Sequence, residues 1–188
     1  MWTLAYCDGL TGLPARRALN QALGQLGGRY AIAMLDVDHF KRFNDRYGHR
    51  TGDDVLKMIA ARMRRIPGGR PFRYGGEELA VLFAGRAVQS AAERMEHFRA
   101  SLARTPFVLR HLPRADKKAR GRKTGPTAMR RQVTITVSIG LAESGKSHRR
   151  AADVLAAADK ALYRAKGAGR NGVVAQSTGS RRSRRKAA

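Results

Sequence analysis

An alternating pattern at residues 133–141 restricts the fold more than any other feature of the chain. Apolar residues at Val133, Ile135, Val137, Ile139 and Leu141 are separated by the polar or small residues Thr134, Thr136, Ser138 and Gly140. Successive side chains point to opposite faces along an extended strand, so a period of two predicts a strand of a β-sheet. The other elements must therefore be arranged around a sheet.

The remaining elements alternate between helix and strand patterns. Leu19, Ala22, Leu23 and Leu26 recur at helical spacing, and the apolar run from Tyr30 to Leu35 predicts a buried strand. Similar patterns predict helices at about 40–48, 53–66, 88–103 and 151–166, and strands at 72–74, 79–83 and 173–174. The order βαββαβ with added helices predicts an α+β fold, with helices packed on a mostly antiparallel sheet.

The net charge of +24 is concentrated in two segments that lack hydrophobic periodicity. Residues 110–131 hold nine Lys or Arg against the single Asp116, and residues 181–186 add five more. We interpret them as a flexible basic insertion at about 110–131 and a disordered basic tail at 176–188, attached to one domain at 1–175. Solvated charge is the favoured explanation, and an anionic partner such as nucleic acid or a lipid membrane is the alternative.

Two sequence features bear on the compartment. No run of about 18 apolar residues could span a bilayer, and the N-terminus lacks the pattern of a signal peptide. Cys7 is the only cysteine, which excludes a disulfide within the chain and a thiolate cluster for zinc. We therefore expect a cytoplasmic protein in a reducing environment.

Two groups of carboxylates are candidates for a functional site. Asp36-Val37-Asp38 follows the buried strand, where a sheet edge can direct a carboxylate and a backbone carbonyl at one point. Glu77 and Glu78 follow Gly75-Gly76 on a short connection that suits a β-hairpin, and the glycines allow close approach of a ligand. Taken alone, the hairpin acids could serve solubility. Together the two groups suit magnesium, which binds through few carboxylates together with phosphate oxygens.

The segment Gly75-Gly76-Glu77-Glu78-Leu79 resembles the signature of GGDEF-family diguanylate cyclases, in which Phe is more common at the last position. Stretches within 8–17, 36–52, 137–140 and 158–171 resemble the same family in the same order, so the resemblance covers about residues 8–174. It implies a ferredoxin-like, nucleotidyl-cyclase-like fold with a βαββαβ core. It also implies an enzyme of bacterial second-messenger signalling that condenses two GTP into cyclic di-GMP and two pyrophosphates.

The same resemblance implies a role for each matching residue. Magnesium, or manganese in its place, would be held by the carboxylates of Asp36, Glu77 and Glu78 and by the backbone carbonyl of Val37, and Glu77 would also be the general base. The substrate would contact a larger set: Asn44 and Asp53 at guanine, Lys41, Lys166 and Arg170 at the phosphates, and Gly75 and Gly76 at the turn. Adenine would be rejected because it would leave buried polar groups unpaired.

Other matching residues are interpreted as structural. Asp8, in the turn before the first helix, is expected to pair with an arginine and to have no catalytic role. Ser138 and Gly140 are interpreted as small residues that allow close packing of the sheet.

The implied reaction also predicts partners. A ring made of two identical halves requires two GTP-loaded domains that face each other, so catalysis implies a homodimer. We further expect an upstream sensory domain in a longer parent chain. Two other hypotheses are a catalytically inactive domain that binds GTP or cyclic di-GMP, and a basic nucleic-acid-binding protein. The intact acids and Asn44 argue against the first, and only the basic segments support the second.

Overall fold

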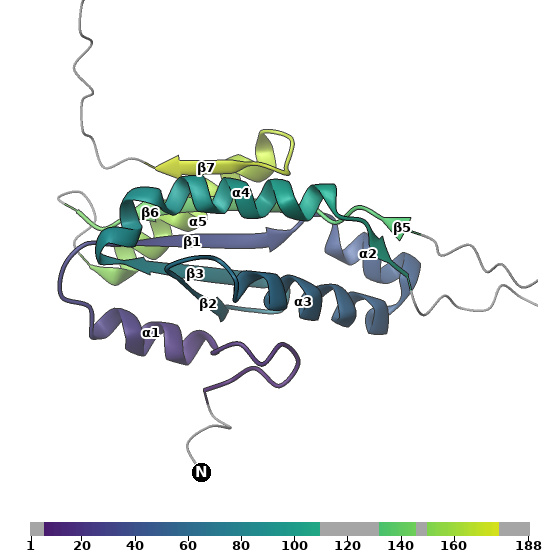
Figure 1. Cartoon of the computed structure of the whole chain (residues 1–188), viewed down its shortest axis with the longest axis horizontal. Helices are drawn as coiled ribbons and strands as arrows, with labels where there is room; N and C mark the ends of the chain where they lie inside the picture. Colours follow the sequence, from purple (N-terminus) through teal and green to yellow (C-terminus); the bar gives the residue numbers. More distant parts are fainter. Residues whose placement is uncertain (1–5, 110–131, 146–149, 177–188) are drawn as a thin grey trace, which may run out of the picture.

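The computed structural model describes residues 6–109, 132–145 and 150–176. Its centre is a five-stranded sheet with the order β2-β3-β1-β6-β7 (Figure 1). The strands are β1 (Tyr30–Val37), β2 (Gly69–Arg73), β3 (Glu78–Ala84), β6 (Val137–Glu143) and β7 (Val173–Gln176). Neighbouring strands are antiparallel except β6 and β7, which are parallel. The predicted α+β fold with a mostly antiparallel sheet is confirmed.

Helices cover both faces of this sheet. In the described ranges they are α1 (Arg16–Gly24), α2 (Phe40–Tyr47), α3 (His49–Met63), the 3-10 helix η1 (Gly85–Ser90), α4 (Ala91–Arg104) and α5 (Ala151–Gly167). Apolar side chains of α3 and α4 form one core with the sheet, and those of α1 and α5 form a second core on the opposite face. The sheet is therefore the middle layer of three.

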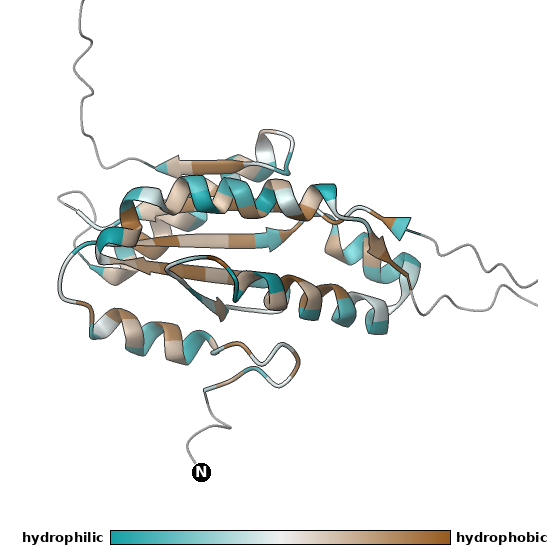
Figure 2. Cartoon of the chain, viewed as in Figure 1, coloured by the Kyte–Doolittle hydropathy of each residue, from teal (hydrophilic) through white to brown (hydrophobic). Residues whose placement is uncertain are grey.

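β1 is buried along its whole length because it lies between these two cores. Leu35 and Val37 belong to the core beneath α3 and α4, whereas Ile32 and Met34 belong to the core beneath α1 and α5. Figure 2 shows brown along the central strands and teal at the carboxyl end of β1. By the period of two, Asp36 lies on the α5 face of the sheet.

The alternating segment at 133–141 is divided between two sheets. β5 (Gln132–Val133) pairs with β4 (Phe107–Val108) in a separate two-stranded sheet, and only β6 joins the main sheet. The prediction of one continuous strand is therefore wrong. The alternation of apolar and polar residues indicates which face of a sheet each residue occupies. It does not indicate which strand the backbone pairs with.

Two helix starts also differ from the prediction. α3 begins at His49 rather than at about Asp53, because Gly48 adopts a φ of 82° that ends α2 and leads directly into the next helix. The helix predicted from Val88 begins as η1, and its regular part starts at Ala91.

The basic insertion predicted at about 110–131 and residues 177–188 of the predicted tail lie outside the described residues. Gln176, where that tail was predicted to begin, is the last residue of β7. Val108 and Gln132, on either side of the insertion, are paired in the β4–β5 sheet. None of the described helices is long and apolar enough to cross a membrane.

Candidate functional site

Two carboxylates lie opposite each other where the central strands meet the signature hairpin. Asp36, near the end of β1, is in register with Glu78, the first residue of β3, and with Ser138 of β6 on its other side. Residues that are directly opposite share a face of the sheet, so all three lie on the face covered by α5. Strand register therefore brings together two of the residues predicted from the sequence.

Negative charge exceeds positive charge at this edge of the sheet. Asp36 is only 7% exposed, and its Oδ2 lies 2.8 Å from Nζ of Lys166 on α5. Burial raises the pKa of Glu77, the nearby charges of Asp36 and Glu78 raise it further, and the charge of Lys166 opposes this rise. Three carboxylates thus share one nearby ammonium, which favours the approach of a further cation.

The signature turn is closed by its backbone. The amide groups of Tyr74 and Gly75 both donate to the carbonyl of Glu78, at 2.9 and 3.1 Å. A Cβ at Gly75 would lie 2.9 Å from Oε2 of Glu78, whereas a Cβ at Gly76 would meet nothing within 4 Å. Gly75 therefore makes room for the Glu78 side chain, and Gly76 leaves open space that a ligand can enter.

The donor set at the sheet edge suits a hard divalent cation. In the described residues no three His, Cys, Asp or Glu side chains form a preformed metal cage. Magnesium does not need one, because it binds through one or two carboxylates together with substrate phosphates. The side chain of Val37 is buried in the core on the opposite face, so only its backbone could contribute. The oxygen-rich, negatively charged edge fits the cation expected from the sequence.

A second group of predicted residues lies where α2 meets α3. Oδ1 of Asn44 is buried and has no hydrogen-bond partner among the described residues. A Cβ at Gly52 would lie 1.9 Å from this oxygen, so any larger residue at position 52 would force the Asn44 amide out of its observed position. Asp53, which is partly buried, is the next residue of α3. A buried amide without a partner is costly unless a ligand satisfies it.

Two predicted phosphate-binding residues are separate from the carboxylates. Lys41 on α2 and Arg170 after α5 are exposed, and no ion pair in the described part of the chain joins either to the acids. Arg170 adopts a φ of 65° and Asn171 a φ of 42°, a conformation that non-glycine residues rarely adopt. The loop after α5 is therefore held in an unusual shape.

Asp38 holds that loop, a role that the sequence analysis missed. Its carboxylate accepts hydrogen bonds from Oγ1 of Thr136 at 2.7 Å, Oγ of Ser138 at 2.6 Å and the backbone amide of Asn171 at 3.0 Å. The period of two that places Asp36 on the α5 face also places Asp38 there, so the sequence pattern could have indicated the face on which Asp38 lies. Ser138 therefore binds a carboxylate in addition to packing closely.

We expect Glu77→Gln to raise the thermal midpoint of the metal-free protein at neutral pH, because it removes a charge that Asp36 and Glu78 repel. The pKa of Glu77 is raised in the folded state, so its unfavourable effect is absent below about pH 4 and appears as the pH rises through the folded pKa. The gain should therefore grow from acidic to neutral pH. Thermal unfolding at several pH values measures it.

Glu96→Gln is a control in which the thermal midpoint is expected to change in the opposite direction. A hydrogen bond from Arg99 lowers the pKa of Glu96 despite partial burial, so the ionised side chain favours folding. Its replacement should lower the midpoint slightly at neutral pH, and this loss should vanish as the pH falls through the folded pKa. A midpoint that falls in Glu77→Gln as well would contradict the charge balance at the sheet edge.

Comparison with known proteins agrees with this arrangement. The family model for the GGDEF domain of diguanylate cyclases matches residues 5–116 and 108–172. The chain belongs to the GGDEF family. This GGDEF domain is 37% identical over 181 residues to diguanylate cyclase DgcP of Pseudomonas aeruginosa, and 33% identical over 182 residues to response regulator PleD of Caulobacter vibrioides.

The matched regions cover most of this GGDEF domain but a minor part of these relatives. They span 89% of the chain and 23% of DgcP, and 91% of the chain and 36% of PleD. The crystal structure of the GGDEF domain of DgcB from Caulobacter crescentus in complex with c-di-GMP is 33% identical, with a TM-score of 0.74. That match covers 91% of this chain and 95% of the DgcB chain.

Proposed function

We propose that this GGDEF domain is a diguanylate cyclase, which condenses two GTP into cyclic di-GMP and releases two pyrophosphates. The observation that carries the proposal is the strand register that sets Asp36 opposite Glu78, with Glu77 beside them and Lys166 within 2.8 Å of Asp36. Acids and a lysine at one sheet edge suit a nucleoside triphosphate that arrives with a divalent cation. The relative named as a diguanylate cyclase supports the same assignment.

Asp36, Glu77 and Glu78, with the carbonyl of Val37, would hold magnesium or manganese, which would stabilise the phosphoryl oxygens and the leaving group. Glu77 would accept the proton of the 3′-hydroxyl of one GTP. Its raised pKa makes it a stronger base than an ordinary glutamate. The freed oxygen forms a bond to the α-phosphorus of the other GTP, the bond from that phosphorus to the bridging oxygen breaks, and pyrophosphate leaves. A second exchange closes the ring.

Substrate recognition would be divided between the two residue groups. Asn44 and Asp53 would bind guanine, and the unpaired Oδ1 of Asn44 would accept a hydrogen bond from it. Lys41, Lys166 and Arg170 would contact the phosphates, together with the backbone of Gly75 and Gly76. Lys166 would then exchange its contact with Asp36 for one with the triphosphate.

We expect Asn44→Ala to reduce the preference for GTP over ATP by about tenfold or more, because it removes a buried group that pairs with guanine and not with adenine. Asp53→Ala should act in the same direction. Competition of GTP and ATP for the purified protein measures the preference. Asn20→Ala, at an exposed position of α1, is the control. An unchanged preference in Asn44→Ala would contradict the assignment of the guanine site.

The proposed enzyme acts as a homodimer. One domain supplies one set of acids and one guanine site, whereas cyclic di-GMP contains two equivalent halves. Two loaded domains must therefore face each other. Activity per milligram should rise with protein concentration in the dilute range, until association is complete.

The proposed function is tested by incubating the protein with GTP and magnesium and separating the nucleotides by chromatography. We expect cyclic di-GMP to accumulate with GTP and no cyclic dinucleotide to form with ATP. GTP that is bound and recovered unchanged would contradict the proposal and favour an inactive binding domain.

A further inference from the structure

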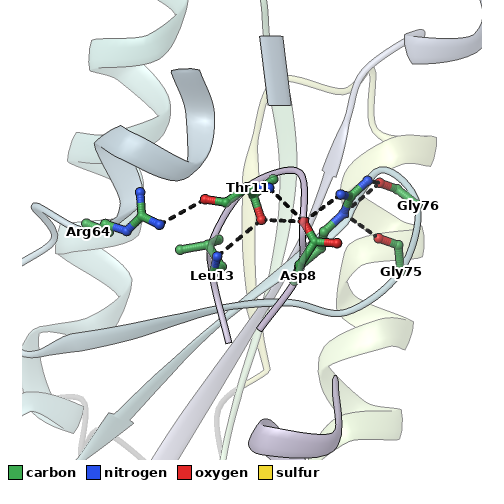
Figure 3. A network of polar contacts seen from close by, with 7 residues as sticks. Asp8, Thr11, Leu13, Arg64, Gly75 and Gly76 are labelled. Carbon is green, nitrogen blue, oxygen red and sulfur yellow. Dashed lines mark hydrogen bonds and ion pairs between the residues drawn. The ribbon is translucent and has the colours of Figure 1, made fainter. Parts of the chain in front are cut away.

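Arg73, the last residue of β2, contacts the signature turn through its guanidinium group (Figure 3). Nε lies 3.1 Å from the carbonyl of Gly75 and 3.2 Å from that of Gly76, and Nη2 lies 2.6 Å from the carbonyl of Gly76. These carbonyls belong to the two residues that precede Glu77. The guanidinium therefore fixes the peptide groups from which Glu77 projects.

The other arm of Arg73 is bound to the turn that precedes α1. Nη1 donates to Oδ1 of Asp8 at 2.7 Å, and both side chains are less than a quarter exposed. In Figure 3, dashed lines run from one guanidinium group to Asp8 and to the carbonyl groups of Gly75 and Gly76, in agreement with the contacts of Arg73. The pairing of Asp8 with an arginine, expected from the sequence, is present.

Asp8 is itself held in place. Its Oδ1 accepts hydrogen bonds from the backbone amide of Thr11 at 2.8 Å and from Oγ1 of Thr11 at 2.7 Å. The carbonyl of Thr11 accepts a hydrogen bond from Arg64 at the end of α3, and the neighbouring Leu13 is fully buried. The amide of Arg73 also donates to the carbonyl of Pro14 at 2.9 Å. The turn at residues 8–14 is therefore a rigid support for the Arg73 side chain.

The signature turn needs such a support. Gly75 and Gly76 carry no side chains that could pack, and the acids that follow repel each other and Asp36. Within the hairpin, the amides of Tyr74 and Gly75 both bond to the single carbonyl of Glu78. The outward carbonyls are held by Arg73. A planar guanidinium can contact both carbonyls and Asp8 together, whereas a lysine ammonium cannot match this geometry.

We propose that Arg73 is a positioning residue that sets the orientation of Glu77, and that Asp8 fixes the guanidinium for this task. The inference rests on the proposed function, because it takes Glu77 as the base. Arg73→Lys and Asp8→Asn should then lower kcat and leave KM for GTP within about twofold, since the guanine-binding residues and the cationic side chains proposed at the phosphates lie on other elements. A displaced base costs about tenfold or more in kcat.

The test combines steady-state kinetics with the backbone amide NMR signals of Gly76 and Glu77 in the metal-free protein. We expect both variants to move these two signals and to lower kcat. In the variant that carries both changes the losses should not add, because the two residues act through one contact. Arg29→Lys is the matched control, since Arg29 also pairs with a carboxylate, that of Glu143, but at an exposed position.

Retention of kcat in Arg73→Lys with unmoved signals would overturn the inference, since charge alone would then suffice. A rise in KM with unchanged kcat would also overturn it. Asp8→Asn keeps an oxygen acceptor for Thr11, so it tests the same point if Arg73→Lys does not fold. If the unmodified protein makes no cyclic di-GMP, the proposed function fails, and the NMR signals still decide whether Arg73 and Asp8 set the turn.

Discussion

Asp36→Asn is expected to lower cyclic di-GMP formation by about 100-fold or more while the protein stays folded. The substitution removes the carboxylate that lies opposite Glu78 and contacts Lys166, at the centre of the proposed metal site. Metal stabilisation of a transferring phosphoryl group is worth several kcal/mol, and about 1.4 kcal/mol corresponds to a factor of ten in rate. Folding should survive because the change also relieves repulsion between Asp36, Glu77 and Glu78.

The rate of cyclic di-GMP formation at saturating GTP and magnesium measures this effect, and circular dichroism verifies the fold. Asp159→Asn is the matched control, because Asp159 is an exposed aspartate on α5. It should retain full activity. Asp36→Asn with more than about a tenth of the original rate would show that Asp36 is not a metal ligand in the reaction.

The second large effect is a loss of folding stability. Gly140→Ala would place a Cβ 2.1 Å from the backbone nitrogen of Leu162 and 2.2 Å from the carbonyl oxygen of Ala158. Both atoms belong to the backbone of α5, so the clash cannot be relieved by a side-chain rotation. Overpacking a core costs about 1–3 kcal/mol, and a backbone clash belongs at or above the upper end. That is a large fraction of the roughly 5–15 kcal/mol that stabilises a domain.

Urea unfolding of the original protein and of the Gly140→Ala variant measures this loss of stability. Gly24→Ala is the control, because a Cβ at this last residue of α1 meets nothing within 4 Å. It should leave the free energy of unfolding unchanged or raise it by about 0.5–1 kcal/mol. A Gly140→Ala protein as stable as the original would mean that α5 does not pack against β6 as closely as described.

Much of the fold follows from local sequence patterns. The apolar run at 30–35 and the helical spacing at 151–166 predict β1 and α5 within two residues of their observed ends, because burial between two layers leaves a local signature. The division of 133–141 could not be predicted. Val133 pairs with Phe107, which is distant in sequence, and periodicity carries no information about such a partner.

The sequence predicted which residues belong to the site better than it predicted which of them contact each other. The carboxylates of Asp36 and Glu78 were expected together, and strand register places them opposite each other. The ion pair of Lys166 with Asp36 was not predicted, because it depends on how the last turn of α5 lies on the sheet. The pattern of the strand could indicate the face on which Asp38 lies but not its partners, which come from β6 and from the loop after α5.

The central claim is most directly tested by measuring pyrophosphate and cyclic di-GMP released from the same GTP reaction in the presence of magnesium. The proposed chemistry predicts two pyrophosphates for each cyclic di-GMP, with the formation of both products lowered about 100-fold or more in the Asp36→Asn protein. Release of inorganic phosphate from GTP without a cyclic dinucleotide would indicate simple hydrolysis and contradict the proposal. A complete lack of turnover by the unmodified protein would contradict it equally.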